Sequence, residues 1–203
     1  MTQHNCRFCD IWAQKYAHPT FDKPFLTGKG YLSIVSIGAF IDGWSLIVPK
    51  EHIYSLRTHY DKSTFWNYVS LTAKHIQKVY GKRLIAFEHG ANSCDSKTSC
   101  GTHHAHLHLV PFDTSLFPEL EADRKWMKVS ADKVSELVGE SEYLLYSDLE
   151  YTGDFPSVYI HILEKEESQF FRKFLAEKLG VEDYSYKTAP HLLQTEKSYE
   201  DLK

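Results

Sequence analysis

The stretch HHAHLHLVPF at residues 103–112 is the most informative part of this chain, because histidine stands at every second position of its centre. These residues are His104, His106 and His108, with small or apolar residues between them. Side chains of a strand point alternately to its two faces, so the pattern predicts a strand with three imidazoles on one face. On a regular strand His103 points to the opposite face, and we interpret it as a strand-edge residue.

Three imidazoles on one strand face favour two kinds of chemistry. Histidines at alternate strand positions can converge on a zinc ion. Alternatively, a neutral imidazole can act as a nucleophile while its neighbours orient it and hold phosphate oxygens. The remaining interpretation, a polar strand face that happens to contain histidine, is the weakest, because three histidines in strict alternation are improbable by chance.

Apolar runs before this stretch predict an antiparallel sheet with one long helix. The helix is expected over residues 61–81, where apolar positions recur with helical spacing and Gly81 follows as a stop signal. Strands are expected at residues 31–37, 45–50, 83–88 and 103–112. Strands, one long helix, further strands and a second helix together predict the α+β class.

The C-terminal part of the chain has a less regular pattern. We expect an irregular segment at 116–128, a short helix at 131–138, and a hairpin of 143–148 and 157–164. Residues 167–179 are amphipathic and are followed by Gly180, which predicts a second helix. The polar tail after residue 185 is expected to be loosely held.

The composition limits the classes of partner. The chain has 203 residues, 42% of them hydrophobic, as in ordinary soluble globular proteins. Its net charge of -4 argues against an extended nucleic-acid surface but allows a local basic pocket for one phosphate chain. No apolar run approaches about 20 residues, and the polar first ten residues do not resemble a signal peptide. We therefore expect a cytoplasmic protein with no membrane partner and mostly reduced cysteines.

Three blocks of the sequence resemble the histidine-triad (HIT) superfamily, and they occur in the family's order. HAHLHLV at 104–110 is similar to the signature in which His-x-His-x-His is followed by apolar residues. DGWSLIVPKEHI at 42–53 resembles the upstream block, and CRFCDIW at 6–12 resembles the opening of many bacterial members. The resemblance implies a HIT-like core with an N-terminal zinc-binding segment over residues 1–115. It also implies a C-terminal α/β extension over 116–203 that packs on that core, as in longer bacterial-type relatives.

The resemblance implies an enzyme that acts at the α-phosphate of a nucleotide through a nucleotidyl-histidine intermediate. His106 corresponds to the nucleophile and His108 to the contact for a phosphate oxygen, while His104 completes the catalytic triad. Attack requires an unprotonated nitrogen on His106, so its other nitrogen needs a hydrogen-bond acceptor that fixes the tautomer. Forming and then breaking an N–P bond divides one difficult step into two easier ones.

The loop before the triad is expected to contact the substrate. In the family, the segment corresponding to TSCGT at 98–102 supplies backbone N–H groups and a polar side chain near the leaving group. Gly101 occupies the position where many members have Ser or Thr, and Ser99 and Thr102 are the candidate substitutes. His89, in the segment FEHG, is a further candidate substrate contact, and an ordinary strand end is the competing interpretation.

Two more positions depart from the family pattern. Trp44 stands where many members have a histidine that supports the nucleophile. Ser36 stands near the position of the usual ribose-binding aspartate. These departures bear on nucleoside specificity more than on the chemistry at phosphorus.

The pair Cys6 and Cys9 forms a C-x-x-C motif whose spacing allows two thiolates to bind one ion. The resemblance adds His52 and His104, which would complete a closed tetrahedral Zn²⁺ site of structural type. The competing interpretation is two free buried thiols, because a C-x-x-C motif alone has several uses.

The second predicted helix is a candidate substrate contact. The segment ESQFFRKFLAEKLG at 167–180 resembles a C-terminal segment of some longer bacterial relatives. Gln169 and Arg172 lie near the predicted helix start, where free N–H groups favour an anion, and a guanidinium can bind phosphate with two hydrogen bonds. We therefore expect both to hold substrate, against the alternative of a solvated helix face.

Four functions remain open on the sequence. The leading one is a hydrolase that releases a nucleoside monophosphate from a dinucleoside polyphosphate, a nucleotide-sugar or a phosphoramidate. A nucleotidyltransferase or phosphorylase would use the same His106 with another acceptor. The others are a non-catalytic nucleotide-binding module and an enzyme in which the triad binds catalytic zinc. The expected partner is a nucleotide or nucleotide conjugate, and the resemblance adds a homodimer.

Overall fold

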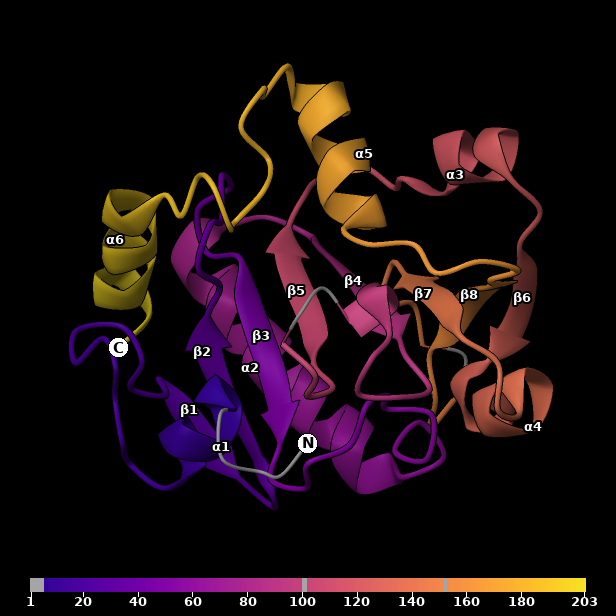
Figure 1. Cartoon of the computed structure of the whole chain (residues 1–203), viewed down its shortest axis with the longest axis horizontal. Helices are drawn as coiled ribbons and strands as arrows, with labels where there is room; N and C mark the ends of the chain where they lie inside the picture. The colour runs from indigo at the N-terminus through magenta and orange to yellow at the C-terminus, as the bar shows by residue number, and fades with distance from the viewer. Residues whose placement is uncertain (1–5, 100–101, 152) are drawn as a thin grey trace.

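The computed structural model of the chain describes residues 6–99, 102–151 and 153–203. Within these ranges the strands form one antiparallel sheet in the order β1-β2-β3-β5-β4-β7-β8-β6 (Figure 1). The strands are β1 (Leu26–Gly28), β2 (Tyr31–Val35), β3 (Ser45–Pro49), β4 (Leu84–Gly90), β5 (Leu107–Pro111), β6 (Met127–Ser130), β7 (Tyr143–Ser147) and β8 (Ser157–Ile162). The helices are α1 (Arg7–Trp12), α2 (Ser63–Tyr80), α3 (Phe117–Asp123), α4 (Val134–Val138), α5 (Phe170–Leu179) and α6 (Leu192–Leu202). The predicted α+β class is confirmed.

The long helix α2 covers one face of the sheet. Its buried side chains, among them Phe65, Val69 and Ile76, share a core with Ile47 and Leu109 of the central strands. These positions recur at helical spacing, which is why the sequence pattern predicts the helix correctly. The helix ends at Gly81, whose left-handed φ of 66° suits a glycine C-cap.

The opposite face of the sheet is covered at two separate places. Here we call it the site face. The register aligns Leu46, His108, Phe87 and Tyr146 in one row across neighbouring strands on this face. Near one end of the row α1 packs through Phe8 on Leu46 and its neighbours. Near the other end α5 packs on Phe87 and Tyr146 (Figure 1). The middle of the row, around His108, is therefore left between two helices.

The predicted strand over residues 103–112 is wrong in its extent, because β5 begins only at Leu107. The pairing of Ile47 with Leu107 would place Pro49 opposite Ala105 if the ladder continued. Proline has no N–H to donate to a ladder, and Ala105 instead donates its N–H to the carbonyl of Ile53 at 2.7 Å. His104 and His106 thus precede the strand, and His103 adopts a left-handed φ of 48°.

Two C-terminal expectations are also wrong. The segment 116–128 is not irregular, since it contains α3 and β6. The tail after residue 185 is not loosely held, since it contains α6, which packs beside α2 and β2 (Figure 1). The sequence pattern conceals α6 because its buried positions include Thr195 and Ser198, whose hydroxyl accepts a hydrogen bond from Gly43 N at 3.0 Å. The predicted short helix at 131–138 and the hairpin of β7 and β8 are confirmed.

Residues 116–203 extend the same sheet. β7 pairs with β4 on the side opposite to β5, so the C-terminal strands continue the N-terminal ones edge to edge. The division of the chain at residue 115 stays a prediction. No helix in the described ranges is both long and apolar enough to cross a lipid bilayer.

Gly43 gives a test of this packing. It has a φ of 77°, and an added Cβ would collide with the ring of Tyr80 at the end of α2. We expect Gly43→Ala to lower the free energy of unfolding by about 3 kcal/mol, from left-handed strain plus steric overlap. Gly81→Ala is the matched control, because Gly81 has a similar φ of 66° and open space around it. If urea denaturation showed the same decrease in the free energy of unfolding for both variants, the packing described at Gly43 would be contradicted.

Candidate functional site

A cavity opens on the site face between α1 and α5. It is lined by Arg7, Phe8, Ser36, Ile37, Leu46, His89, Thr102, His106, His108, Arg172 and Tyr186. These residues include two guanidinium groups and no carboxylate. The cavity is therefore suited to an anion, although the whole chain has a net charge of -4.

The imidazole of His106 is held in one tautomer. Its Nδ1 lies 2.9 Å from the backbone carbonyl of His104, and a carbonyl can only accept, so Nδ1 carries the proton. Burial lowers the pKa of His106 to about 4, with a smaller contribution from Arg172 and Arg7. The ring is thus neutral, and Nε2 has an unprotonated lone pair.

His108 is held in the opposite tautomer. The indole Nε1–H of Trp44 donates to Nδ1 of His108 at 2.9 Å, so the proton of the neutral ring is on Nε2. Burial holds the pKa of His108 well below its usual value. Its ring stacks on Phe87 at 4.5 Å between centroids and lies 4.8 Å from the ring of His106. One imidazole of the pair therefore offers a lone pair and the next offers a hydrogen-bond donor.

Arg172 reaches the cavity from α5, and its expected contact with substrate stays a prediction. Its guanidinium donates to the carbonyls of Gly38 and Ile37 at 2.6 and 3.0 Å and to Oγ of Ser36 at 2.9 Å. It also lies over the ring of Trp44, 4.5 Å from the centroid. Arg172 thus adds positive charge and fixes the loop after β2. Gln169 does not line the cavity, and its Nε2 donates to Ser185 at 3.4 Å.

Among the described residues of the loop before β5, Thr102 lines the cavity. It donates its hydroxyl to the carbonyl of Ser99 at 3.1 Å. The hydroxyl of Ser99 donates to the carbonyl of Ser96 at 2.9 Å and faces a separate small hollow behind His106. Gly101 lies outside the described residues, so its expected role stays a prediction.

His89 lines both the cavity and the small hollow. Its ring lies 6.4 Å from that of His108 and 5.3 Å from that of Phe171. Burial lowers its pKa to about 3, with smaller contributions from His106 and Arg172. The structure thus brings a third neutral imidazole beside the pair.

The four side chains expected to bind zinc come together. The Sγ atoms of Cys6 and Cys9 and the Nδ1 atoms of His52 and His104 all lie within 4.8 Å of one another. Cys6 Sγ is 3.3 Å from His104 Nδ1, and Cys9 Sγ is 3.1 Å from His52 Nδ1. These separations are close to those of ligands around a tetrahedral zinc ion with bond lengths of about 2.0–2.3 Å.

The chemistry of the donor set also fits a metal. Nε2 of His104 lies 3.0 Å from the carbonyl of Pro49, so Nε2 carries the proton and the lone pair is on Nδ1, toward the thiols. Two thiolates and two imidazoles form a closed set of structural type. The cluster can therefore hold a metal such as zinc, which would connect α1 to the end of β3 and to the residue that supports His106.

Five cavity residues were not expected from the sequence, namely Arg7, Phe8, Ile37, Leu46 and Tyr186. Phe8 packs its ring against His104 and His106, at 5.6 and 5.3 Å between centroids. Its neighbour Arg7 lies between the two cysteines, so the C-x-x-C motif itself was the signal that this segment approaches the triad. Tyr186 comes from the connection between α5 and α6, where no motif indicated a role.

Comparisons with known proteins add one distant structural likeness. No protein-family model matches the chain, and no curated protein sequence matches it. One similar solved structure is described as a hypothetical histidine triad nucleotide-binding protein from Sulfolobus tokodaii strain 7. It is 16% identical, with 98% of this chain and 94% of that chain covered and a TM-score of 0.39. At that similarity the functional argument depends on the geometry of the site.

The metal cluster can be tested by zinc content. We expect the purified protein to contain about one zinc per chain and Cys9→Ser to lose most of it, because one of four ligands is removed. The loss should also lower the melting temperature, since metal binding stabilises the folded state. Cys94→Ser is the matched control, because Cys94 is a free thiol outside the cluster. A zinc-free wild-type protein whose melting is insensitive to zinc and chelators would refute the site.

Proposed function

We propose that this protein is a HIT-type nucleotide hydrolase that acts at an α-phosphate through a nucleotidyl-His106 intermediate. The observation that carries the proposal is the pair of opposite tautomers at His106 and His108. Nδ1 of His106 donates to a carbonyl, and Nδ1 of His108 accepts from Trp44. The cavity thus has a bare nitrogen able to attack phosphorus beside an N–H able to bind a phosphoryl oxygen.

The first step forms a bond between Nε2 of His106 and the α-phosphorus. The bond from phosphorus to the leaving group breaks, and its electron pair departs with that group. The ring of His106 becomes positively charged, and the hydrogen bond from Nδ1 to the carbonyl of His104 stabilises this charge. Nε2–H of His108 donates to a non-bridging oxygen, where negative charge increases in the transition state.

The second step transfers the nucleotidyl group to water. Water attacks phosphorus, the N–P bond breaks, and the electron pair returns to Nε2 of His106, which restores the neutral ring. The products are a nucleoside monophosphate and the leaving group. The proposed substrates are a dinucleoside polyphosphate, a nucleotide-sugar or a phosphoramidate. Transfer to phosphate or a sugar phosphate would use the same intermediate, and product analysis with and without phosphate distinguishes the two.

Other features support the proposal without extending it. The sequence blocks at 6–12, 42–53 and 104–110 resemble the HIT superfamily, and the cavity has cationic rather than acidic walls. Thr102 and His89 are the proposed substrate contacts among the remaining wall residues, with Arg172 as the cation behind Ser36. A homodimer and a cytoplasmic location stay predictions.

The covalent step predicts the behaviour of His106→Ala. We expect turnover of a reactive adenylyl substrate to fall by roughly 10⁴-fold, because the imidazole proposed to form the intermediate is removed. Mass spectrometry of acid-free quenched wild-type protein should find one nucleotidyl group on the peptide that contains His106. His161→Ala is the control, since His161 is on β8 outside the cavity. Unchanged turnover in His106→Ala would favour a non-catalytic or metal-based role for the triad.

The hydrogen bond from Trp44 predicts that its removal changes the tautomer of His108. Trp44→Phe removes the N–H that donates to Nδ1 of His108 while keeping an aromatic ring in the core. We expect kcat to fall about tenfold or more, because His108 no longer has one fixed tautomer. Nitrogen-15 NMR of the imidazoles should show the proton of His108 on Nε2 in the wild type and a mixture in the variant. An unaltered tautomer would show that Trp44 has only a packing role.

A further inference from the structure

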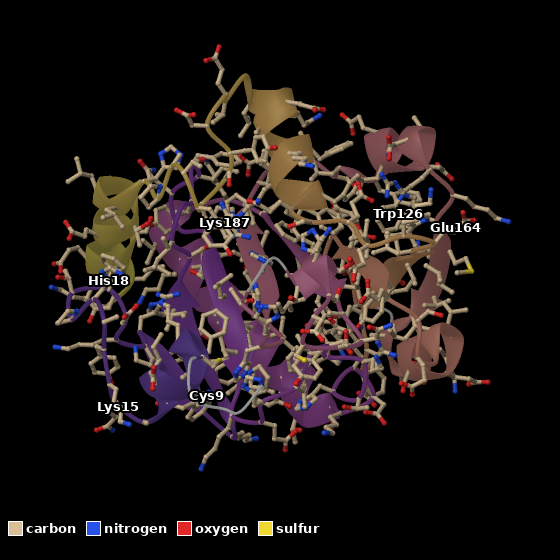
Figure 2. The ribbon with its side chains drawn as sticks, in the orientation of Figure 1. Cys9, Lys15, His18, Trp126, Glu164 and Lys187 are labelled. Carbon is tan, nitrogen blue, oxygen red and sulfur yellow. The ribbon has the colours of Figure 1, made fainter. Side chains whose placement is uncertain are left out.

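Arg7 lies on the boundary between the cavity and a second hollow. The cavity has Arg7 in its wall, and the neighbouring hollow is lined by Arg7, Asp10, Lys15, Tyr16 and Ala17. Both hollows adjoin α1, and Figure 2 labels Cys9 on this helix and Lys15 just beyond it. A ligand too long for the cavity could therefore continue past Arg7 along α1.

The guanidinium of Arg7 is held in a fixed orientation. Its Nε and Nη2 donate to Oδ1 of Asp22 at 3.1 and 2.5 Å. Asp22 is fully buried, and its Oδ2 accepts from the backbone N–H of His18 at 2.7 Å. Within the described residues, Nη1 of Arg7 makes no hydrogen bond. One edge of the guanidinium is thus anchored, and the other is available to a ligand.

Arg7 packs beside the same phenyl ring as the proposed nucleophile, His106. The central carbon of the guanidinium is 5.6 Å from the centroid of the Phe8 ring. The same ring is 5.3 Å from the ring of His106. Arg7 and His106 thus both flank the Phe8 ring and both line the same cavity, so a ligand in that cavity can meet the cation and the imidazole.

A second cation lies near Arg7. Lys15 lines the hollow beyond Arg7 together with one carboxylate, Asp10, while Asp22 pairs with Arg7 itself. Inside the cavity the other cation is Arg172, whose guanidinium donates to backbone carbonyls and to Ser36. Arg7 is thus better placed than Arg172 to bind phosphate oxygens directly, and guanidinium groups bind phosphate strongly.

The loop hydroxyls near the cavity are poorly placed to protonate a leaving group. The hydroxyl of Thr102 donates to the carbonyl of Ser99, and that of Ser99 donates to the carbonyl of Ser96. A phosphate leaves as a stable anion and needs no proton, whereas the amine of a phosphoramidate does. Both observations favour a leaving group that ends in phosphate.

We infer that Arg7 forms a leaving-group subsite that binds the phosphates next to the one attacked by His106. This inference rests on the proposed function. It makes the substrate a nucleotide whose α-phosphate is joined to further phosphates by an anhydride bond. When the N–P bond forms, the P–O anhydride bond breaks and its electron pair becomes the new charge on the departing phosphate. Arg7 stabilises that charge.

Two adenylyl substrates with different leaving groups test the inference. Diadenosine tetraphosphate releases ATP, and adenosine 5′-phosphoramidate releases ammonia, while the step at His106 is the same for both. We expect Arg7→Gln to lower kcat/KM for the tetraphosphate at least about tenfold more than for the phosphoramidate, because an ionic contact to the leaving group is lost. Arg7→Lys should recover part of this selectivity, since it keeps the charge. Arg83→Gln, an exposed arginine outside both hollows, is the control.

The outcomes separate this inference from the proposed function. If Arg7→Gln lowered kcat/KM equally for both substrates, or for neither, the proposed subsite would be overturned. A wild-type protein that turns over neither substrate would count against the proposed function. In that case binding of inorganic tripolyphosphate, measured by calorimetry, decides the matter: weaker binding to Arg7→Gln supports the subsite, and equal binding overturns it. Unchanged melting temperature and zinc content show that each variant is folded.

Discussion

The hydrogen bond from Nδ1 of His106 to the carbonyl of His104 is the interaction on which the rest of the site depends. It leaves the bare nitrogen on the other side of the ring, where a phosphorus atom can be attacked. The carbonyl in turn is positioned by the side chain of His104, whose Nε2 donates to Pro49 and whose Nδ1 belongs to the Cys2His2 cluster. A metal in that cluster would therefore stiffen the residue that fixes the tautomer, although it is not itself at the reacting atom.

The position of the cavity follows from how the two faces of the sheet are covered. One face is closed by the long helix α2, whereas the other is covered by α1 and α5 at separate places. His108 belongs to the row of side chains on the site face between α1 and α5. The cavity therefore lies where neither helix covers the sheet. Its walls come from both ends of the chain, with Arg7 near the start and Arg172 and Tyr186 near the end.

Much of this arrangement can be predicted from the sequence, because period-two and period-3.6 patterns report which side chains face the core. His106 and His108, two residues apart in the alternation, both line the cavity, but the strand start was missed because a proline on the partner strand ends the ladder. Helix α6 was missed because its buried Thr195 and Ser198 are polar. Gln169 is outside the cavity because it occupies the left-handed position before α5, a conformation that its residue type does not signal. Tyr186 depends on contacts between distant segments, which no local pattern contains, whereas the position of Arg7 inside the C-x-x-C motif was a signal that could have found it.

The pairing of β4 with β7 has a consequence for how this protein can be made or shortened. β4 is a central strand with β5 on one side, and β7 satisfies the backbone groups on its other side. A chain that ended after residue 115 would expose that side as a long row of free N–H and C=O groups, which recruits strands from other molecules. The half of the chain without the triad thus acts as a shield against self-association for the half that contains it.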